Sequence, residues 1–215
     1  MLTRFRQRKH AVMRFWRWPI LFCYAEGKTA LDPAYPATFE ILRESRLPLL
    51  DLGCGIGLLS AFLWARGHRP EMLGIDADAK KIRVASRALA GTTAQFLAGD
   101  AREFPPHSGN VVALDVVHYF NDAEQQAWLR RIAASIAPGG VAIVRATLHE
   151  PGWRYSATKA EEWLIHRCRW IPWAGWNFPT REEICAPFRE AGFVEDVRPM
   201  WGWTPFNGYL FTFRR

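Results

Sequence analysis

The feature that most constrains the fold of this chain is an apolar segment that runs directly into closely spaced glycines. Residues 47–52 form the apolar segment, Gly53, Gly55 and Gly57 follow it, and a helical pattern covers residues 58–66. Because glycine has no Cβ, a turn of this kind between a buried strand and a helix lets the backbone approach a ligand closely. The G-x-G-x-G spacing differs from the G-x-G-x-x-G of dinucleotide enzymes. The turn therefore predicts a ligand site, with a purely structural turn as the alternative.

The rest of the chain alternates apolar runs with helical patterns, which is typical of a parallel α/β sheet. Strands are expected at residues 71–75, 95–98, 111–114, 141–146, 193–200 and 209–213, and helices at residues 78–90, 123–137, 157–169 and from 180–183 to about 191. We expect residues 1–46 to form a helical segment and residues 47–215 one domain, with a tryptophan-rich insert at residues 147–179. The length of 215 residues and a hydrophobic content of 49% fit such a globular domain.

Acidic side chains follow the second and third expected strands. Asp76 stands 19 residues after Gly57, where a carboxylate accepts hydrogen bonds from both hydroxyls of a ribose. Asp78 suits the N-cap of the next helix better than Asp76 does. After the third strand, Asp100 can accept from an adenine amino group, and the backbone N–H of Ala101 can satisfy a ring nitrogen.

With these residues in place, the chain resembles the class I S-adenosylmethionine-dependent methyltransferases over about residues 45–146 and its final helix and two strands. The resemblance implies a Rossmann-like three-layer sandwich, whose mostly parallel seven-stranded sheet has an antiparallel last strand, here residues 207–213. Residues 112–119 are similar to the family's fourth motif, which borders the methyl-transfer site, and residues 138–140 to its turn before the fifth strand. The antiparallel strand separates this family from nicotinamide-dependent dehydrogenases.

The resemblance implies S-adenosyl-L-methionine as cofactor and S-adenosyl-L-homocysteine as product. It assigns the cofactor to Tyr24, Lys28, Asp51, Gly53, Cys54, Gly55, Gly57, Asp76, Ala77, Asp100, Ala101, Asp115 and Val116. The three glycines would contact its methionine and ribose portions, and Tyr24 and Lys28 would reach the methionine end from the N-terminal segment.

Methyl transfer from a sulfonium is an in-line displacement, so catalysis depends on positioning and desolvation, and only a weak nucleophile such as a phenol needs a base. His118, after the fourth expected strand, is the first candidate because histidine titrates near neutrality. His149, just past the fifth strand, is the second. The alternative is that His118 only packs or orients its loop, and we expect Asp115 to serve the cofactor or the architecture.

Aromatic residues indicate the class of acceptor. The chain holds 11 tryptophans, concentrated before the first strand and in the insert, and aromatic walls suit a planar or hydrophobic molecule. We assign the substrate to Trp18, Tyr119, Trp153, Tyr155, Trp173 and Trp176. A phenolic, quinone-type or aryl-polyene pigment precursor fits, and so does an acyl chain on a carrier protein. A core role for many of these aromatics is the alternative.

Residues 1–28 carry seven Lys or Arg and one Glu, most of the net charge of +7. Such an arm favours an anionic partner, either the inner face of a membrane or an acidic carrier protein, or else it is a solvated terminus. RNA or protein methylation is the alternative function, but the fourth motif lacks the Pro-Pro-aromatic pattern of base-methylating enzymes. A second alternative is a non-catalytic module that binds the cofactor.

The four cysteines lie far apart, so we expect reduced thiols and no zinc site. No segment approaches the ~18 apolar residues of a membrane span, which predicts a cytoplasmic protein.

Overall fold

The computed structural model describes residues 2–167, 177–201, 205 and 207–215. Seven strands form one sheet in the order β3-β2-β1-β4-β5-β7-β6. These strands are β1 (Leu49–Leu52), β2 (Met72–Asp76), β3 (Ala94–Ala98), β4 (Asn110–Leu114), β5 (Val141–Thr147), β6 (Val194–Pro199) and β7 (Gly208–Arg214). The first five run parallel, and β7 is inserted antiparallel between β5 and β6. The expected Rossmann-like fold is confirmed.

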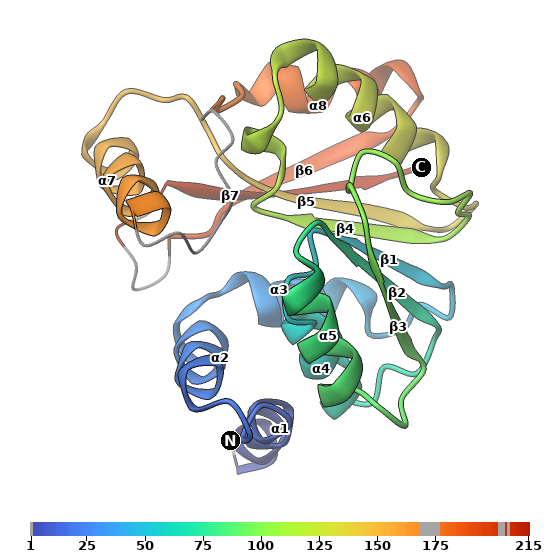
Figure 1. The fold of residues 1–215 in the computed structure, drawn as a ribbon. Helices are drawn as coiled ribbons and strands as arrows, with labels where there is room; N and C mark the ends of the chain where they lie inside the picture. The colour runs from blue at the N-terminus through green and yellow to red at the C-terminus, as the bar shows by residue number, and fades with distance from the viewer. Residues whose placement is uncertain (1, 168–176, 202–204, 206) are drawn as a thin grey trace.

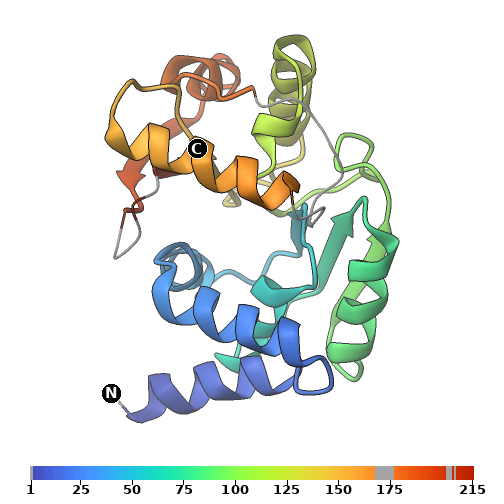
Figure 2. The same ribbon diagram turned by 60° about the vertical axis from the view of Figure 1, so that its left-hand side comes forward.

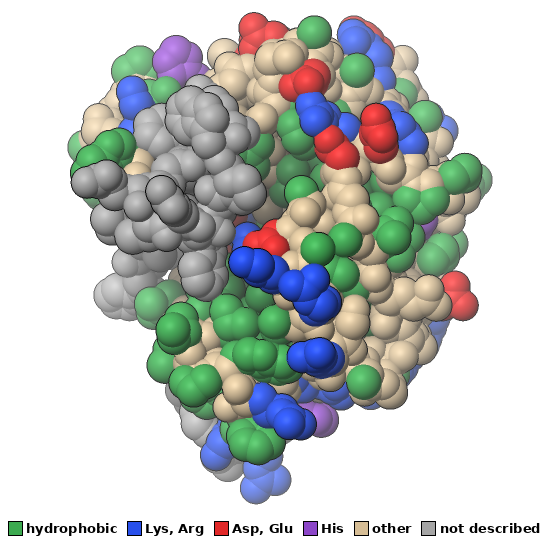
Figure 3. Space-filling model, in the orientation of Figure 1, with side chains coloured by type: hydrophobic (Ala, Val, Ile, Leu, Met, Phe, Trp, Pro, Cys, Tyr) green, Lys and Arg blue, Asp and Glu red, His purple; other side chains and the backbone are tan. Residues whose placement is uncertain are grey.

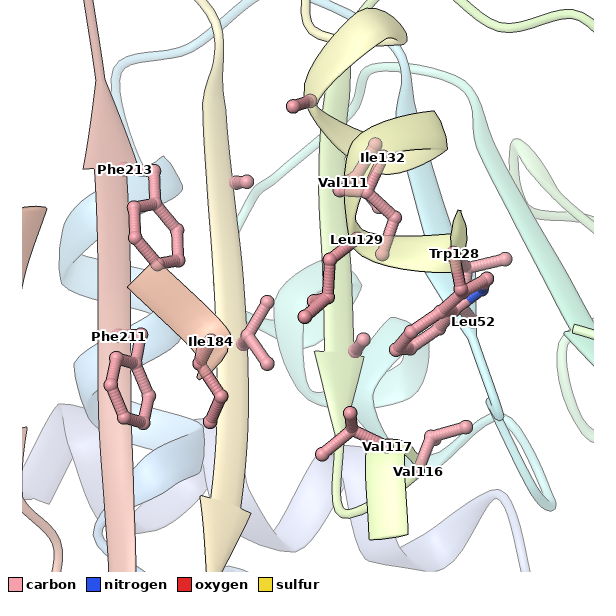
Figure 4. Close-up of a cluster of buried hydrophobic side chains, with 14 of the residues drawn as sticks. Leu52, Val111, Val116, Val117, Trp128, Leu129, Ile132, Ile184, Phe211 and Phe213 are labelled. Atoms are coloured by element: carbon pink, nitrogen blue, oxygen red, sulfur yellow. The ribbon is translucent and has the colours of Figure 1, made fainter. Parts of the chain in front are cut away.

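Helices cover both faces of the sheet, giving three layers (Figure 1). On one face lie α6 (Asp122–Ala134) and α8 (Arg181–Glu190); on the other lie α4 (Leu58–Ala65) and α5 (Ala79–Ala88). Figure 4 shows Leu129 and Ile132 of α6 beside Val111, while Ile184 of α8 lies beside Phe211. Burial of these side chains fixes the sheet, and therefore the positions of its strand ends.

Capping residues set several helix boundaries. Asp78 caps α5 by accepting from the backbone N–H of Lys80 at 2.8 Å, and Thr180 forms a capping box with Glu183 at α8, as predicted. Helix α6 begins one residue earlier than expected, because Asn121 is its N-cap and forms a second capping box with Glu124. In the insert, α7 (Trp153–Arg167) begins four residues earlier than expected.

The first 42 residues form α1 (Leu2–Met13), α2 (Pro19–Leu31) and α3 (Ala34–Leu42). Helix α1 packs against α4, and Ala11, Val12 and Phe15 are fully buried there. Helix α2 lies between α1 and α7 in both ribbon views (Figures 1 and 2). None of the helices in the described ranges has the length and apolar content needed to cross a membrane.

Candidate functional site

A cavity of about 920 Å³ opens at the carboxyl ends of β1, β2, β4 and β5, and α2 and α3 form its opposite wall. This is the switch point of the sheet, where β1 lies between β2 and β4 and the chain order reverses. Open α/β sheets bind ligands at such points. Of the expected cofactor residues, the cavity is lined by Tyr24, Lys28, Asp51, Gly53, Cys54, Gly55, Asp76, Ala77, Asp100, Ala101, Asp115 and Val116.

The three glycines of the turn have different surroundings. All have positive φ, with values of 75° at Gly53, 55° at Gly55 and 74° at Gly57. A Cβ on Gly53 would lie 2.2 Å from Cγ2 of Val116, whereas a Cβ on Gly55 would meet no atom within 4 Å. Gly57 is not part of the cavity lining; it caps α4, and a Cβ there would lie 2.9 Å from the Phe96 ring. Gly55 therefore faces open space, while Gly53 and Gly57 allow close packing.

Asp76 holds the glycine turn in place. Its Oδ2 accepts from the backbone N–H of Gly55 at 2.9 Å, and its Oδ1 accepts from the N–H of Asp78 at 2.9 Å. Because each carboxylate oxygen can accept more than one hydrogen bond, both oxygens retain capacity for hydroxyl groups in the cavity. The carboxylate thus combines a structural role with the expected binding role.

Asp51 lies beneath the same turn and is only 3% exposed. Its Oδ2 is buried, and no hydrogen-bond partner for it exists among the described residues. Burial, with a smaller contribution from the charge of Asp76, raises the pKa of the Asp51 carboxyl to about 7. An unpartnered buried carboxylate is costly, so this position favours a ligand with a positive charge or hydrogen-bond donors.

The loop after β3 is anchored more firmly than the sequence indicated. Arg102 forms ion pairs with Asp100 and with Glu124 of α6, and its hydrogen bonds lower the pKa of the Asp100 carboxyl. The indole N–H of Trp128 donates to the carbonyl of Ala101 at 2.8 Å. Asp100 therefore shares its oxygens with Arg102, a lining residue that sequence analysis missed.

Charged and polar residues near the ends of β5 and α2 and within α7 also line the cavity, although the sequence did not indicate them. Arg145, at the end of β5, contacts Asp32 after α2 and Asp115 after β4. The only sequence signal was an arginine within the apolar run of residues 141–146. Other lining residues outside our predictions include Ile20, Tyr35, Phe120, Thr147, Thr158 and Gly208.

Neither of the two histidines expected to act as a base, His118 and His149, lines the cavity. The His118 ring is 2% exposed and packs against Tyr119 and Phe178, with ring centroids 4.1 and 5.5 Å away. His149 is exposed, and its ring lies 5.3 Å from that of Tyr155. In this arrangement Tyr119, and not His118, presents its side chain to the cavity.

Three of the four described aromatic residues expected at the acceptor lie outside the cavity lining. Trp18 is partly buried against the core cluster beneath α1 and α4, and Trp153 is 67% exposed. Tyr155 packs edge-on against Phe178. Trp173 and Trp176 lie outside the described residues. Tyr119 is therefore the one member of the described part of this set that lines the cavity.

Comparisons with known proteins agree with this geometry. A family model described as a methyltransferase domain matches residues 49–140. A ubiquinone biosynthesis O-methyltransferase of Cereibacter sphaeroides (strain KD131 / KCTC 12085) is 32% identical over 175 residues, which are 75% of this chain and 64% of that protein. The mitochondrial ubiquinone biosynthesis O-methyltransferase of Arabidopsis thaliana is 29% identical over 197 residues, covering 82% of this chain and 54% of that protein. The chain thus spans less than two thirds of the length of either relative.

Solved structures share the fold. The magnesium protoporphyrin IX methyltransferase of Synechocystis PCC 6803, crystallised with S-adenosylhomocysteine, superimposes with a TM-score of 0.66. The two proteins are 18% identical, and the match covers 85% of this chain and 82% of that one.

Proposed function

Because the chain belongs to the class I S-adenosylmethionine-dependent methyltransferases, we propose that it methylates an oxygen of a small aromatic acceptor. The cavity carries this proposal: about 920 Å³ lies near the top of the ~300–1,000 Å³ range of ligand pockets and accommodates a cofactor together with a small acceptor. The relatives are named ubiquinone biosynthesis O-methyltransferases, which supports a phenolic or quinone-type acceptor for this chain.

The lining residues match the chemical groups of the cofactor. Its ribose hydroxyls suit the remaining acceptor capacity of Asp76, and its positive charges suit the unpartnered Asp51 carboxylate. Its carboxylate suits Lys28, and the open space at Gly55 lets the ligand lie against the turn. When bound, the cofactor supplies a methyl group on a positively charged sulfur.

Polar side chains elsewhere in the cavity can orient the acceptor. Tyr119 follows β4 and Thr147 ends β5, and both line the cavity. Their oxygen atoms can hold an acceptor hydroxyl by hydrogen bonds while the surrounding apolar side chains exclude water. A phenolic hydroxyl held in this way is the acceptor group we propose.

The test is transfer of a labelled methyl group from S-adenosylmethionine to a panel of acceptors. The panel holds prenylated dihydroxybenzoates, aryl acyl groups on a carrier protein, and RNA, with the Asp76→Ala variant as the inactive control. Label in the phenolic compounds supports the proposal. Label confined to the carrier-bound chain, RNA or protein would replace it with one of those acceptors, and no label with any acceptor would favour a non-catalytic module.

Cofactor affinity should increase with pH. The raised pKa of Asp51, about 7, means that its carboxyl is largely protonated in the free protein below that pH. A cationic ligand favours the ionised form, so its binding below about pH 7 requires loss of a proton, and affinity falls by up to ~10-fold per pH unit. Calorimetric titration with S-adenosylmethionine between about pH 6 and pH 8 measures this slope. Asp51→Asn should remove it, and a wild-type affinity that is flat over this range would contradict the role of Asp51.

We also propose that α1 and α2 bring the enzyme to an anionic membrane surface. Met13, Trp16 and Ile20 are 44%, 63% and 75% exposed where these helices meet. Hydrophobic and basic side chains gather over this region in Figure 3. Exposed apolar side chains favour a lipid surface over an acidic carrier protein. An anionic membrane interface buries such side chains and also attracts the neighbouring basic residues.

Co-sedimentation with vesicles tests this contact. Vesicles containing phosphatidylglycerol should bind the wild-type protein, and Trp16→Ala combined with Arg17→Glu should weaken binding by ~10-fold or more. Leu97→Ser, an exposed residue of β3, is the matched control. Equal binding to purely zwitterionic vesicles, or binding to an acidic carrier protein alone, would overturn the proposal.

A further inference from the structure

Strand β5 carries a charged side chain in a buried position. All seven residues of β5 are buried, and Arg145 is only 7% exposed. Leu114 of β4 and Leu210 of β7 are its neighbours in the sheet. A buried charge without partners is strongly unfavourable, so the position of this guanidinium depends on the groups that pair with it.

The partners of Arg145 come from two distant segments. Its Nη1 lies 2.5 Å from Oδ2 of Asp32 and 3.3 Å from Oδ2 of Asp115. Asp32 follows α2 and also receives Lys28 Nζ at 3.3 Å and the backbone N–H of Ala34 at 3.0 Å. The cluster therefore joins the end of α2 and the start of α3 to the carboxyl ends of β4 and β5.

Mutual charges stabilise this cluster. Burial alone would raise the pKa of the Asp32 carboxyl, but Arg145 and Lys28 bring that pKa below its ordinary value. Burial would likewise lower the pKa of the Arg145 guanidinium, whereas Asp115 and Asp32 hold it above its ordinary value. Two cations and two carboxylates thus face one another, with Tyr24 and Tyr35 beside them.

Arg145 also holds Asp115 through the backbone. The N–H of Asp115 donates to the carbonyl of Arg145 at 3.0 Å, and Asp115 has a φ of 60°, left-handed for a residue other than glycine. Such a conformation is unfavourable for a residue with a Cβ and persists where its surroundings impose it. The carbonyl and the guanidinium of Arg145 therefore both hold Asp115, and together they orient it at the cavity.

Helix α2 buries few of its own side chains. The buried residues of α2 are Ala25 and Thr29, and its main packing is against α1, which in turn lies on α4. Gly208 of β7 leaves room for the guanidinium, since a Cβ there would lie 3.2 Å from Nε and 3.3 Å from Nη2 of Arg145. The Asp32–Arg145 ion pair joins the C-terminal end of α2 to β5.

We propose that Arg145 is a positioning residue that docks α2 onto the ends of β4 and β5, and so assembles the cofactor-binding cavity from its two walls. The inference rests on the proposed function only for the choice of ligand. Tyr24 and Lys28 reach the cavity from α2, so undocking of α2 removes these two residues from the ligand and displaces Asp115 as well.

Hydrogen exchange and ligand binding test the proposal together. In the ligand-free protein, Arg145→Met and Asp32→Asn should each speed exchange of the amides of residues 19–31 by ~10-fold or more, relative to the amides of α5. S-adenosylhomocysteine affinity should fall by ~10-fold or more in both variants. Arg145→Lys should recover part of the affinity, because an ammonium group can reach one carboxylate but has no planar fork.

Two further variants keep the test decisive if Arg145→Met fails to fold. Gly208→Ala displaces the guanidinium without removing its charge and should give the same two changes to a smaller extent. Arg189→Met, whose ion pairs with Glu182 and Glu195 are on the surface, should change neither. Unchanged exchange of α2 with unchanged affinity in Asp32→Asn and Gly208→Ala would overturn the proposal. If the wild-type protein bound no ligand, the proposed function would fail, while the exchange measurement would still decide the role of Arg145.

Discussion

Gly53→Ala should destabilise the protein by about 2–5 kcal/mol. The new Cβ would lie 2.2 Å from Cγ2 of Val116, and the residue would have to keep a φ of 75°. Overpacking of a core costs ~1–3 kcal/mol, and left-handed backbone in a residue with a Cβ adds ~1–2 kcal/mol. Neither residue can move easily, because Gly53 directly follows the buried strand β1 and Val116 is packed in the core beneath α6.

Gly55→Ala is the matched control for this substitution. Gly55 also has positive φ, but a Cβ there meets no protein atom within 4 Å. The substitution should therefore cost only ~1–2 kcal/mol of stability, while its methyl group occupies space that we assign to the cofactor. Urea denaturation and calorimetric titration with S-adenosylhomocysteine separate the two effects. Wild-type stability of Gly53→Ala, or wild-type affinity of Gly55→Ala, would contradict this account of the turn.

Asp76→Ala should weaken cofactor binding by ~100-fold, about 3 kcal/mol, since hydrogen bonds to a charged group contribute ~1.5–3 kcal/mol each. The loss exceeds that of a ribose contact alone because the carboxylate also accepts from the N–H groups of Gly55 and Asp78. Without it, the glycine turn loses the acceptor that fixes its shape.

Asp76→Asn is the informative comparison. The amide keeps one oxygen acceptor, but its NH₂ group must face the N–H of either Gly55 or Asp78, where it cannot accept. An intermediate affinity is expected. Titration calorimetry with S-adenosylhomocysteine measures all three proteins, and an affinity of Asp76→Ala within about twofold of wild type would remove Asp76 from the site.

Local patterns predicted the strands and the glycine-turn side of the cavity because both depend on residues close in sequence, whereas the antiparallel last strand followed from the family resemblance. The strand–turn–helix around Gly53 and the caps at Asp78 and Thr180 are local features, so their positions follow from the sequence. Asp76 and Asp100 could be placed because carboxyl ends of neighbouring parallel strands meet at one edge of the sheet.

The opposite wall could not be predicted in the same way. Asp32 and Arg145 are 113 residues apart, and only the docking of α2 brings them together. The sequence does not indicate which way each aromatic side chain points. We expected Trp18 and Trp153 in the cavity lining, and both lie outside it. The turn at Val117–Tyr119 similarly decides that Tyr119 faces the cavity and His118 the core.

Calorimetric titration with S-adenosylmethionine and S-adenosylhomocysteine, with NAD and NADP as controls, tests the central claim most directly. We expect micromolar binding of the two sulfur compounds and none of the nicotinamide dinucleotides. Binding of NAD or NADP, with neither sulfur compound bound, would contradict the methyltransferase assignment. It would identify the glycine turn as that of a nicotinamide-dependent dehydrogenase.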